Sequence, residues 1–127
     1  MQAYLIVFLG AGIGGALRHG VNLACARLCG VVFPWGTLTV NAVGSLAMGL
    51  IAAWLAFRTE EPWSQHVRLF LTTGILGGFT TFSAFSLDAM LLWERGAPLL
   101  AFSYVAGSVV LSIGGLFLGL VLVRSLA

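Results

Sequence analysis

The sequence predicts an all-α membrane protein with four transmembrane helices. Of its 127 residues, 60% are hydrophobic and only 8% are charged, and the mean hydropathy is +1.06. A soluble domain of this length needs more charge to cover its surface. The apolar residues also fall into four long stretches, each exceeding the ~20 residues with which a helix spans the hydrocarbon. We therefore expect one four-helix membrane domain over residues 1–127.

The four stretches are separated by the short joints CGVVFP, RTEEPWS and ERGA. Pro34, Pro62 and Pro98 lie at or beside these joints, where proline is tolerated at a helix start. The expected transmembrane helices cover about residues 3–28, 35–57, 65–93 and 97–123.

The first stretch combines a packing motif with an embedded charge. Gly10 and Gly14 form a GxxxG, a spacing that lets helix backbones approach closely. Arg18 lies past the midpoint, and an arginine at the bilayer centre costs ~3 kcal/mol on insertion scales. Its permanent charge favours an anion in an adjoining aqueous vestibule. The alternative role for Arg18 is a helix-end anchor or a structural ion-pair partner.

Polar stripes run along the second and fourth stretches with a spacing of four residues. The second stretch carries Thr37, Asn41 and Ser45, and the fourth carries Tyr104, Ser108 and Ser112. Residues spaced by four share one helix face. Hydroxyls and amides can donate hydrogen bonds to a dehydrated anion, although such residues can also simply link helices. The fourth stretch also has a GxxxG, at Gly115 and Gly119.

The third stretch contains GILGGFTTFSAFS over residues 74–86, and we expect its helix to be broken near the middle. Gly74, Gly77 and Gly78 are the residues expected to interrupt it. Non-helical backbone at membrane depth survives only where it is buried in protein or lines a cavity, and freed carbonyls at half-helix ends often hold a cation. Beyond the break, Phe82 and Phe85 lie on neighbouring parts of one face. Their positive ring edges can contact an anion, although packing is the commoner use of such rings.

Charges indicate an anion pathway and a weakly biased orientation. Asp88 is the one acidic residue expected within the membrane, as a proton site or as a salt-bridge or hydrogen-bond partner.

The arginines near the helix ends are almost evenly divided between the two sides of the membrane. The side that holds both termini is expected to carry Arg58, Arg68 and Arg124, and the other side is expected to carry Arg27 and Arg95. Because this bias is slight, the chain can insert either way up, and two opposed copies can pair as an antiparallel dimer.

Other classes of function find no support in the sequence. The net charge of +2 is small and scattered, so nucleic acid is not expected as a partner. Cys25 and Cys29 lie one helical turn apart, a poor geometry for a disulfide, and the two histidines lack a metal-ligand pattern. Because no catalytic motif is present, we do not expect an enzyme.

Three motifs of the sequence resemble those of a known family. GGFTTFSAFS, preceded by TTG, closely resembles the third-helix signature of the Fluc/CrcB fluoride channels. WGTLTVN and GGALRHG resemble that family's second-helix motif and first-helix arginine region, and the match extends over the whole chain. The resemblance implies an antiparallel, dual-topology homodimer in the bacterial cytoplasmic (inner) membrane. It also implies passive fluoride efflux, and so fluoride resistance, with a structural sodium ion at the dimer centre.

The resemblance also implies roles for individual residues. The family's fluoride pathway falls on Arg18, Asn41, Thr81, Phe82, Ser83, Phe85, Tyr104, Ser108 and Ser112. The sodium site falls on the backbone carbonyls of Gly77 and Thr80. Asp88 departs from the glutamate that many relatives carry, which keeps the charge but shortens the reach.

Two rival functions remain. A small dual-topology exporter of cationic drugs also has four helices, but it needs a carboxylate in the first helix, where this chain has Arg18 and no acid. The second rival is a non-conducting membrane scaffold whose polar stripes only join helices.

Overall fold

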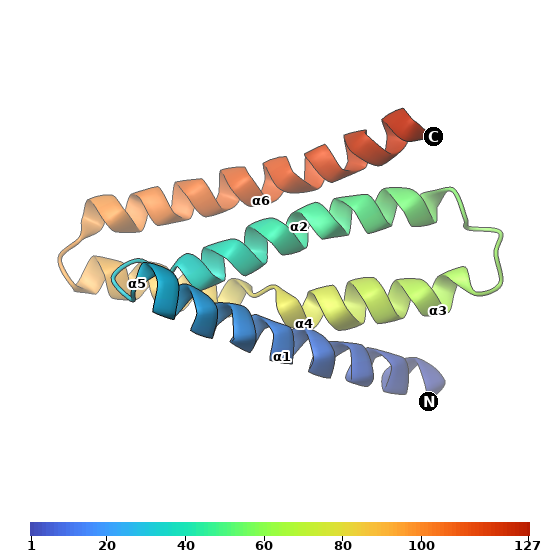
Figure 1. Cartoon of the computed structure of the whole chain (residues 1–127), viewed down its shortest axis with the longest axis horizontal. Helices are drawn as coiled ribbons and strands as arrows, with labels where there is room; N and C mark the ends of the chain where they lie inside the picture. Colours follow the sequence, from blue (N-terminus) through green and yellow to red (C-terminus); the bar gives the residue numbers. More distant parts are fainter.

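Four long helices lie side by side in the computed structural model, which describes residues 1–127 (Figure 1). They are α1 (Gln2–Cys29), α2 (Trp35–Ala56), an interrupted span over Ser64–Glu94, and α6 (Pro98–Leu126). Each is long and apolar enough to cross a membrane, which confirms the predicted four-helix class. Both termini lie at the same end of the bundle as the loop between α2 and the third span (Figure 1).

The third span has four helical pieces. They are α3 (Ser64–Arg68), a π-helix η1 (Leu69–Leu76), α4 (Gly77–Phe79) and α5 (Phe82–Glu94). The chain is extended between α4 and α5, where Thr80 has φ −85° and ψ 160° and Thr81 has φ −155° and ψ 124°. The expected break is therefore present, but it lies a few residues beyond its expected position.

The glycines of the third span are helical, which corrects the expectation that they interrupt the helix. None of them has a positive φ; within the chain, only Gly30 and Gly96, in the joints, do. Gly74 and Gly78 instead face α1, where a Cβ at Gly78 would meet the backbone of Ala11. Their lack of a side chain is needed for close helix packing, not for an unusual backbone conformation.

Both GxxxG motifs pack against helices of the same chain. A Cβ added at Gly10 would lie 2.7 Å from the carbonyl oxygen of Phe70, and one at Gly14 would collide with Ile75. On the other side of the bundle, a Cβ at Gly119 would lie 2.6 Å from the carbonyl oxygen of Leu46. The motifs thus join α1 to the third span and α6 to α2, as their spacing predicts.

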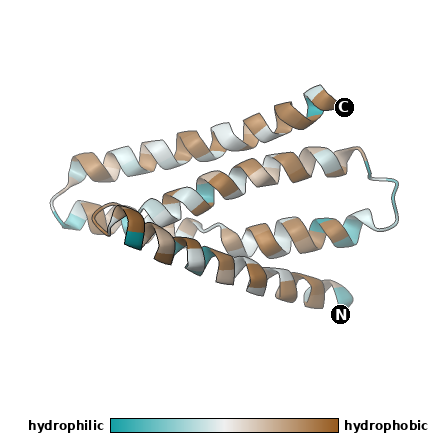
Figure 2. Cartoon of the chain, viewed as in Figure 1, coloured by the Kyte–Doolittle hydropathy of each residue, from teal (hydrophilic) through white to brown (hydrophobic).

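The helices are hydrophobic along most of their length (Figure 2), with hydrophilic residues in the loops, at the chain ends and in parts of α1 and α2. Many large hydrophobic side chains are exposed on the bundle. Few side chains are buried, and the core is a small cluster of Phe85, Leu92, Ala101 and Tyr104. A surface of this kind suits lipid and helix partners rather than water. The chain is a multi-pass membrane protein.

Candidate functional site

The extended residues of the third span are held by the side chain of Asn41, from the middle of α2. Asn41 Nδ2 donates to the carbonyl oxygen of Thr81 at 2.9 Å, and the Thr81 N–H donates to Asn41 Oδ1 at 2.8 Å. The amide therefore satisfies both backbone groups of a residue that has left the helix. An amide carries two N–H groups, so one remains free for another acceptor.

Side chains at the break complete the ends of the two flanking helices. Thr81 Oγ1 accepts from the Ala84 N–H at 3.1 Å and so caps α5, in the manner of N-cap threonines. Thr80 Oγ1 donates to the carbonyl of Leu76 at 2.8 Å. These local bonds explain why a Thr-Thr pair ends one helix and begins the next.

A groove of about 330 Å³ opens beside the break, between α2, the third span and α6. It is lined by residues of all three, namely Asn41, Ser45, Thr80, Thr81, Phe82, Phe85, Ser108, Val109, Ser112 and Ile113. No carboxylate and no cationic side chain lines it. The groove therefore joins neutral hydrogen-bond donors to aromatic and aliphatic surface.

The two phenylalanines lie next to each other but in different surroundings. Their ring centroids are 5.5 Å apart, with the planes inclined at 52°. Phe85 is 9% exposed and packs against Tyr104, at a centroid distance of 5.3 Å, whereas Phe82 is 79% exposed. Phe85 is thus part of the core, while Phe82 presents its ring outside the single chain.

Ser108 is the one buried side-chain oxygen or nitrogen without a hydrogen-bond partner in the chain. The residue is 4% exposed and lines the groove, with Ser112 one turn further along α6. An unpaired hydroxyl in such a place costs free energy, because buried polar groups are nearly always hydrogen-bonded. The residue that lines the groove therefore carries a hydroxyl that the chain itself leaves unpaired.

Three of the residues expected on the pathway lie away from the groove. Tyr104 is fully buried behind Phe85 and its hydroxyl donates to Asp88 Oδ2 at 3.2 Å. Ser83 is exposed, with Oγ 3.4 Å from Thr81 Oγ1. Arg18 reaches the break from α1, where Nη1 donates to the carbonyl of Thr80 at 3.3 Å.

The carbonyls expected to hold sodium lie at the end of α4. In a continuous α-helix the Gly77 carbonyl accepts from the Thr81 N–H, but that N–H is bonded to Asn41. No other donor meets the Gly77 carbonyl. The Thr80 carbonyl accepts from Arg18. No cluster of three or more His, Cys, Asp or Glu side chains is present to bind a metal ion.

Sequence reasoning missed some of what the groove contains. Val109 and Ile113 each follow a serine of the predicted stripe and carry no chemical signal of their own. Ser45 belongs to the polar stripe of α2 that indicated a pathway, but it was not among the residues to which the family resemblance assigned a role. The role of Asn41 in holding backbone was also missed, because no sequence pattern shows the partner of an amide.

Comparison with known proteins shows the family to which the chain belongs. The family model described as "CrcB-like protein, Camphor Resistance (CrcB)" matches residues 5–120. The "Fluoride-specific ion channel FluC" of Rhodopseudomonas palustris (strain BisB5) is 59% identical over 125 residues, covering 98% of this chain and 99% of the relative. The protein of the same name from Methylobacterium nodulans is 62% identical over 120 residues, or 94% of each chain. That of Beijerinckia indica is 55% identical over 127 residues and covers both chains fully. The chain belongs to the CrcB family.

Proposed function

We propose that this protein is a fluoride-selective channel that lets fluoride leave the cell passively across the bacterial cytoplasmic membrane. The observation that carries the proposal is the groove beside the helix break. It combines neutral donors with aromatic rings and contains no carboxylate. Relatives that share more than half of the sequence over nearly their whole length are named fluoride-specific ion channels.

The groove offers a small anion several weak substitutes for water. The Ser108 hydroxyl has no partner in the chain, and the Ser112 hydroxyl lies on the same face of α6. The second N–H of the Asn41 amide and the positive edges of the phenylalanine rings add to these. Conduction needs binding that is favourable enough for entry and weak enough for release. A row of neutral donors meets both needs better than a cationic side chain does.

Arg18 acts next to the groove rather than inside it. Its guanidinium bonds the Thr80 carbonyl on the α1 side of the break. A permanent positive charge near the path attracts anions and repels cations, and Arg18 does not itself line the groove in which the anion binds. Arg18 therefore favours the entry of anions over cations and does little to slow the release of the anion.

A second copy of the chain is part of the proposal. The groove is open in one chain, and the Phe82 ring is 79% exposed although it belongs to the lining. An antiparallel partner closes such a groove into a path, and the near balance of arginines at the two ends permits the opposed insertion.

A sodium ion at the centre of this dimer fits the chemistry of the donors. The Gly77 carbonyl lacks a hydrogen-bond partner, and backbone oxygens at half-helix ends suit hard cations. Gly77 and Thr80 supply two such oxygens from each copy. Bound sodium would coordinate the Gly77 carbonyl, which has no hydrogen-bond donor, and would share the Thr80 carbonyl with Arg18.

The two rival functions receive less support. All four acidic residues, Glu60, Glu61, Asp88 and Glu94, lie outside α1, so α1 has no carboxylate for a cationic drug. A non-conducting scaffold does not explain why the Ser108 hydroxyl is left without a hydrogen-bond partner beside a groove. The Asp88 carboxylate accepts from Tyr104, which favours a role as a hydrogen-bond partner.

Fluoride efflux from liposomes that contain only this protein tests the proposal. We expect rapid release of fluoride down its gradient, with little release of chloride and no need for a proton gradient. Release that depends on protons and a cationic drug supports the exporter, and no release from correctly folded protein supports the scaffold. C-terminal reporters active on both sides of the membrane are expected from dual topology; activity on one side alone excludes the antiparallel dimer.

A further inference from the structure

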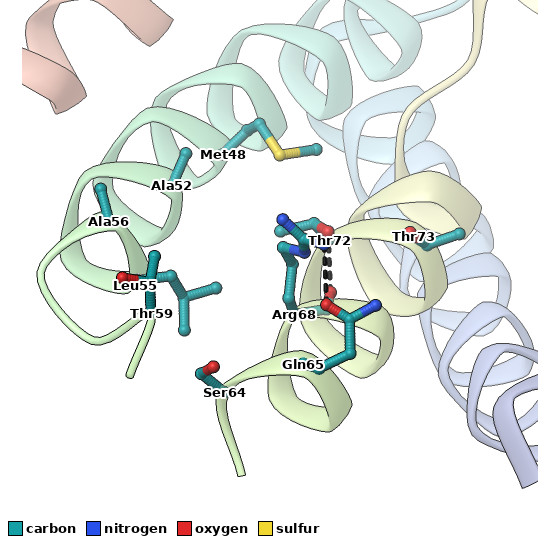
Figure 3. Close-up of a pocket in the computed structure, with 10 residues that line it drawn as sticks. All are labelled: Met48, Ala52, Leu55, Ala56, Thr59, Ser64, Gln65, Arg68, Thr72 and Thr73. Atoms are coloured by element: carbon teal, nitrogen blue, oxygen red, sulfur yellow. Dashed lines mark hydrogen bonds between the residues drawn. The ribbon is translucent and has the colours of Figure 1, made fainter. Parts of the chain in front are cut away.

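A second and larger groove, of about 780 Å³, lies near the end of the bundle that holds both termini. Figure 3 shows it between the C-terminal half of α2 and the first turns of the third span, with Met48 extending from α2 toward the third span and Thr73 pointing away from α2. None of its lining residues lines the groove beside the helix break. The ion pathway therefore does not account for it.

The wall on the third span is polar and positively charged. It carries Ser64, Gln65, Arg68, Thr72 and Thr73, and Thr59 of the adjoining loop completes the rim. Arg68 Nη2 donates to Gln65 Oε1 at 2.7 Å, which holds the side chain along the wall (Figure 3). A guanidinium has five N–H donors, so most of them stay free for an acceptor. No carboxylate lines the groove.

The wall on α2 is apolar. Met48, Ala52, Leu55 and Ala56 form it, with Met48 farthest from the loop. Met48 precedes Ala56 by eight residues, which corresponds to about 12 Å along the helix at ~1.5 Å per residue. The groove therefore joins a polar end near the loop, which carries Arg68, to an apolar strip of α2 that continues toward the middle of the bundle, where the facing wall stays polar at Thr72 and Thr73.

Aromatic residues place the polar end at the depth of lipid headgroups. Trp54 and Trp63 are sequence neighbours of the lining residues Leu55 and Ser64, and their ring centroids are 5.7 Å apart. The Arg58 guanidinium lies 4.6 Å from the centre of the Trp54 ring. Tryptophan and arginine are typical of the membrane–water interface. The polar end of the groove thus lies at headgroup level and its apolar strip at acyl-chain level.

We propose that this groove binds one anionic phospholipid. The lipid phosphate accepts hydrogen bonds from Arg68 and the hydroxyls of the rim, and one acyl chain lies along the strip of α2. Guanidinium groups match phosphate geometry and bind it by paired, charge-assisted hydrogen bonds. A zwitterionic headgroup brings a cation for which the groove has no carboxylate, so the net anionic lipid is preferred.

The test uses the full-length purified protein and native mass spectrometry with added phosphatidylglycerol or phosphatidylcholine. Arg68→Gln removes the charge at similar length, and Arg124→Gln, an exposed arginine at the same end, is the matched control. We expect Arg68→Gln to weaken phosphatidylglycerol binding by about tenfold, the loss of one or two charge-assisted hydrogen bonds. Arg124→Gln should change it less than about twofold.

A second variant tests the apolar strip without altering charge. Ala52→Trp fills the strip from an exposed position on α2, so it should fold normally and also lose phosphatidylglycerol. Unchanged binding in both Arg68→Gln and Ala52→Trp overturns the proposal, as does equal binding of the two lipids by the unmodified protein. Photo-cross-linking of the groove to a second copy of the chain, through a photoactivatable thiol reagent on Gln65→Cys, assigns the groove to a protein partner instead. Reduced fluoride release in Arg68→Gln with lipid binding intact assigns it to the ion path.

Discussion

Replacing Asn41 with aspartate separates two possible uses of this residue, because it keeps the shape of the side chain and removes its donor. In the structure the amide both donates to and accepts from the backbone of Thr81, at 2.9 and 2.8 Å. Aspartate still accepts from the Thr81 N–H, but it places an oxygen against the Thr81 carbonyl. If Asn41 serves mainly to hold the break, the change destabilises the protein itself and not only the bound ion.

The size of the effect follows from the bonds that are lost. One hydrogen bond contributes about 1 kcal/mol net, and the Thr81 carbonyl left without a partner costs about 1–3 kcal/mol more. The sum of about 2–4 kcal/mol corresponds to a shift of about 30- to 1,000-fold in the folding equilibrium. Asn41→Ala should be at least as damaging, since it leaves both backbone groups of Thr81 unpaired.

The measurement is the midpoint of unfolding in a detergent titration, followed by the loss of helical circular dichroism, together with fluoride release from liposomes. Ser45→Ala is the matched control, because Ser45 lies one turn further along α2 and lines the same groove but makes no hydrogen bond to the break. Its stability should change by less than about 0.5 kcal/mol. Unfolding midpoints of Asn41→Asp and Ser45→Ala that both equal that of the unmodified protein would refute the holding role.

Three further predictions concern residues around the groove and the helix contacts. Ser108→Ala should be as stable as the unmodified protein, or more stable by up to about 1 kcal/mol, since it removes an unpaired buried hydroxyl. It should nevertheless slow fluoride release, and unchanged release would remove Ser108 from the path. Phe82→Ile should leave stability unchanged and reduce release, whereas Phe85→Ile should also destabilise by about 1–2 kcal/mol because only Phe85 is buried. Equal stability losses at both positions would contradict this difference. Gly14→Ala should prevent the close approach of α1 to the third span and lower the yield of folded protein, while Gly15→Ala, which faces open space, should behave normally. Normal folding of both would exclude the contact.

The sequence was sufficient for the class of the protein, because length and apolar composition decide which segments can cross a membrane. It also indicated glycine faces that permit close helix packing, but not which helices these faces would meet. It located the helix break only approximately. Glycines indicate where a helix can yield, but the break occurs at Thr80 and Thr81, where Asn41 supplies the lost hydrogen bonds.

The sequence predicted those groove residues that belong to a stripe of polar side chains spaced by four, and it missed those that do not. The stripe of Ser108 and Ser112 places both serines on one face of α6, and the structure brings them to the same groove as Asn41. Tyr104 belongs to the same stripe, yet it lies behind Phe85 because its large ring is buried in the core. Periodicity gives the face of a helix but not the depth of a side chain in the packing.

The π-helix before the break makes the spacing of the third span as important as its composition. Hydrogen bonds in a π-helix reach one residue further than in an α-helix, and here the Gly77 N–H meets the Thr72 carbonyl. The extra residue turns everything that follows by about 100° relative to an uninterrupted α-helix. A continuous α-helix over the same residues would therefore point Thr81 away from Asn41, although every residue of the groove would be retained. The hydrogen-bond pattern of residues 69–76 thus determines which partners the later side chains meet, and a substitution that converts this segment to an α-helix would separate Thr81 from Asn41.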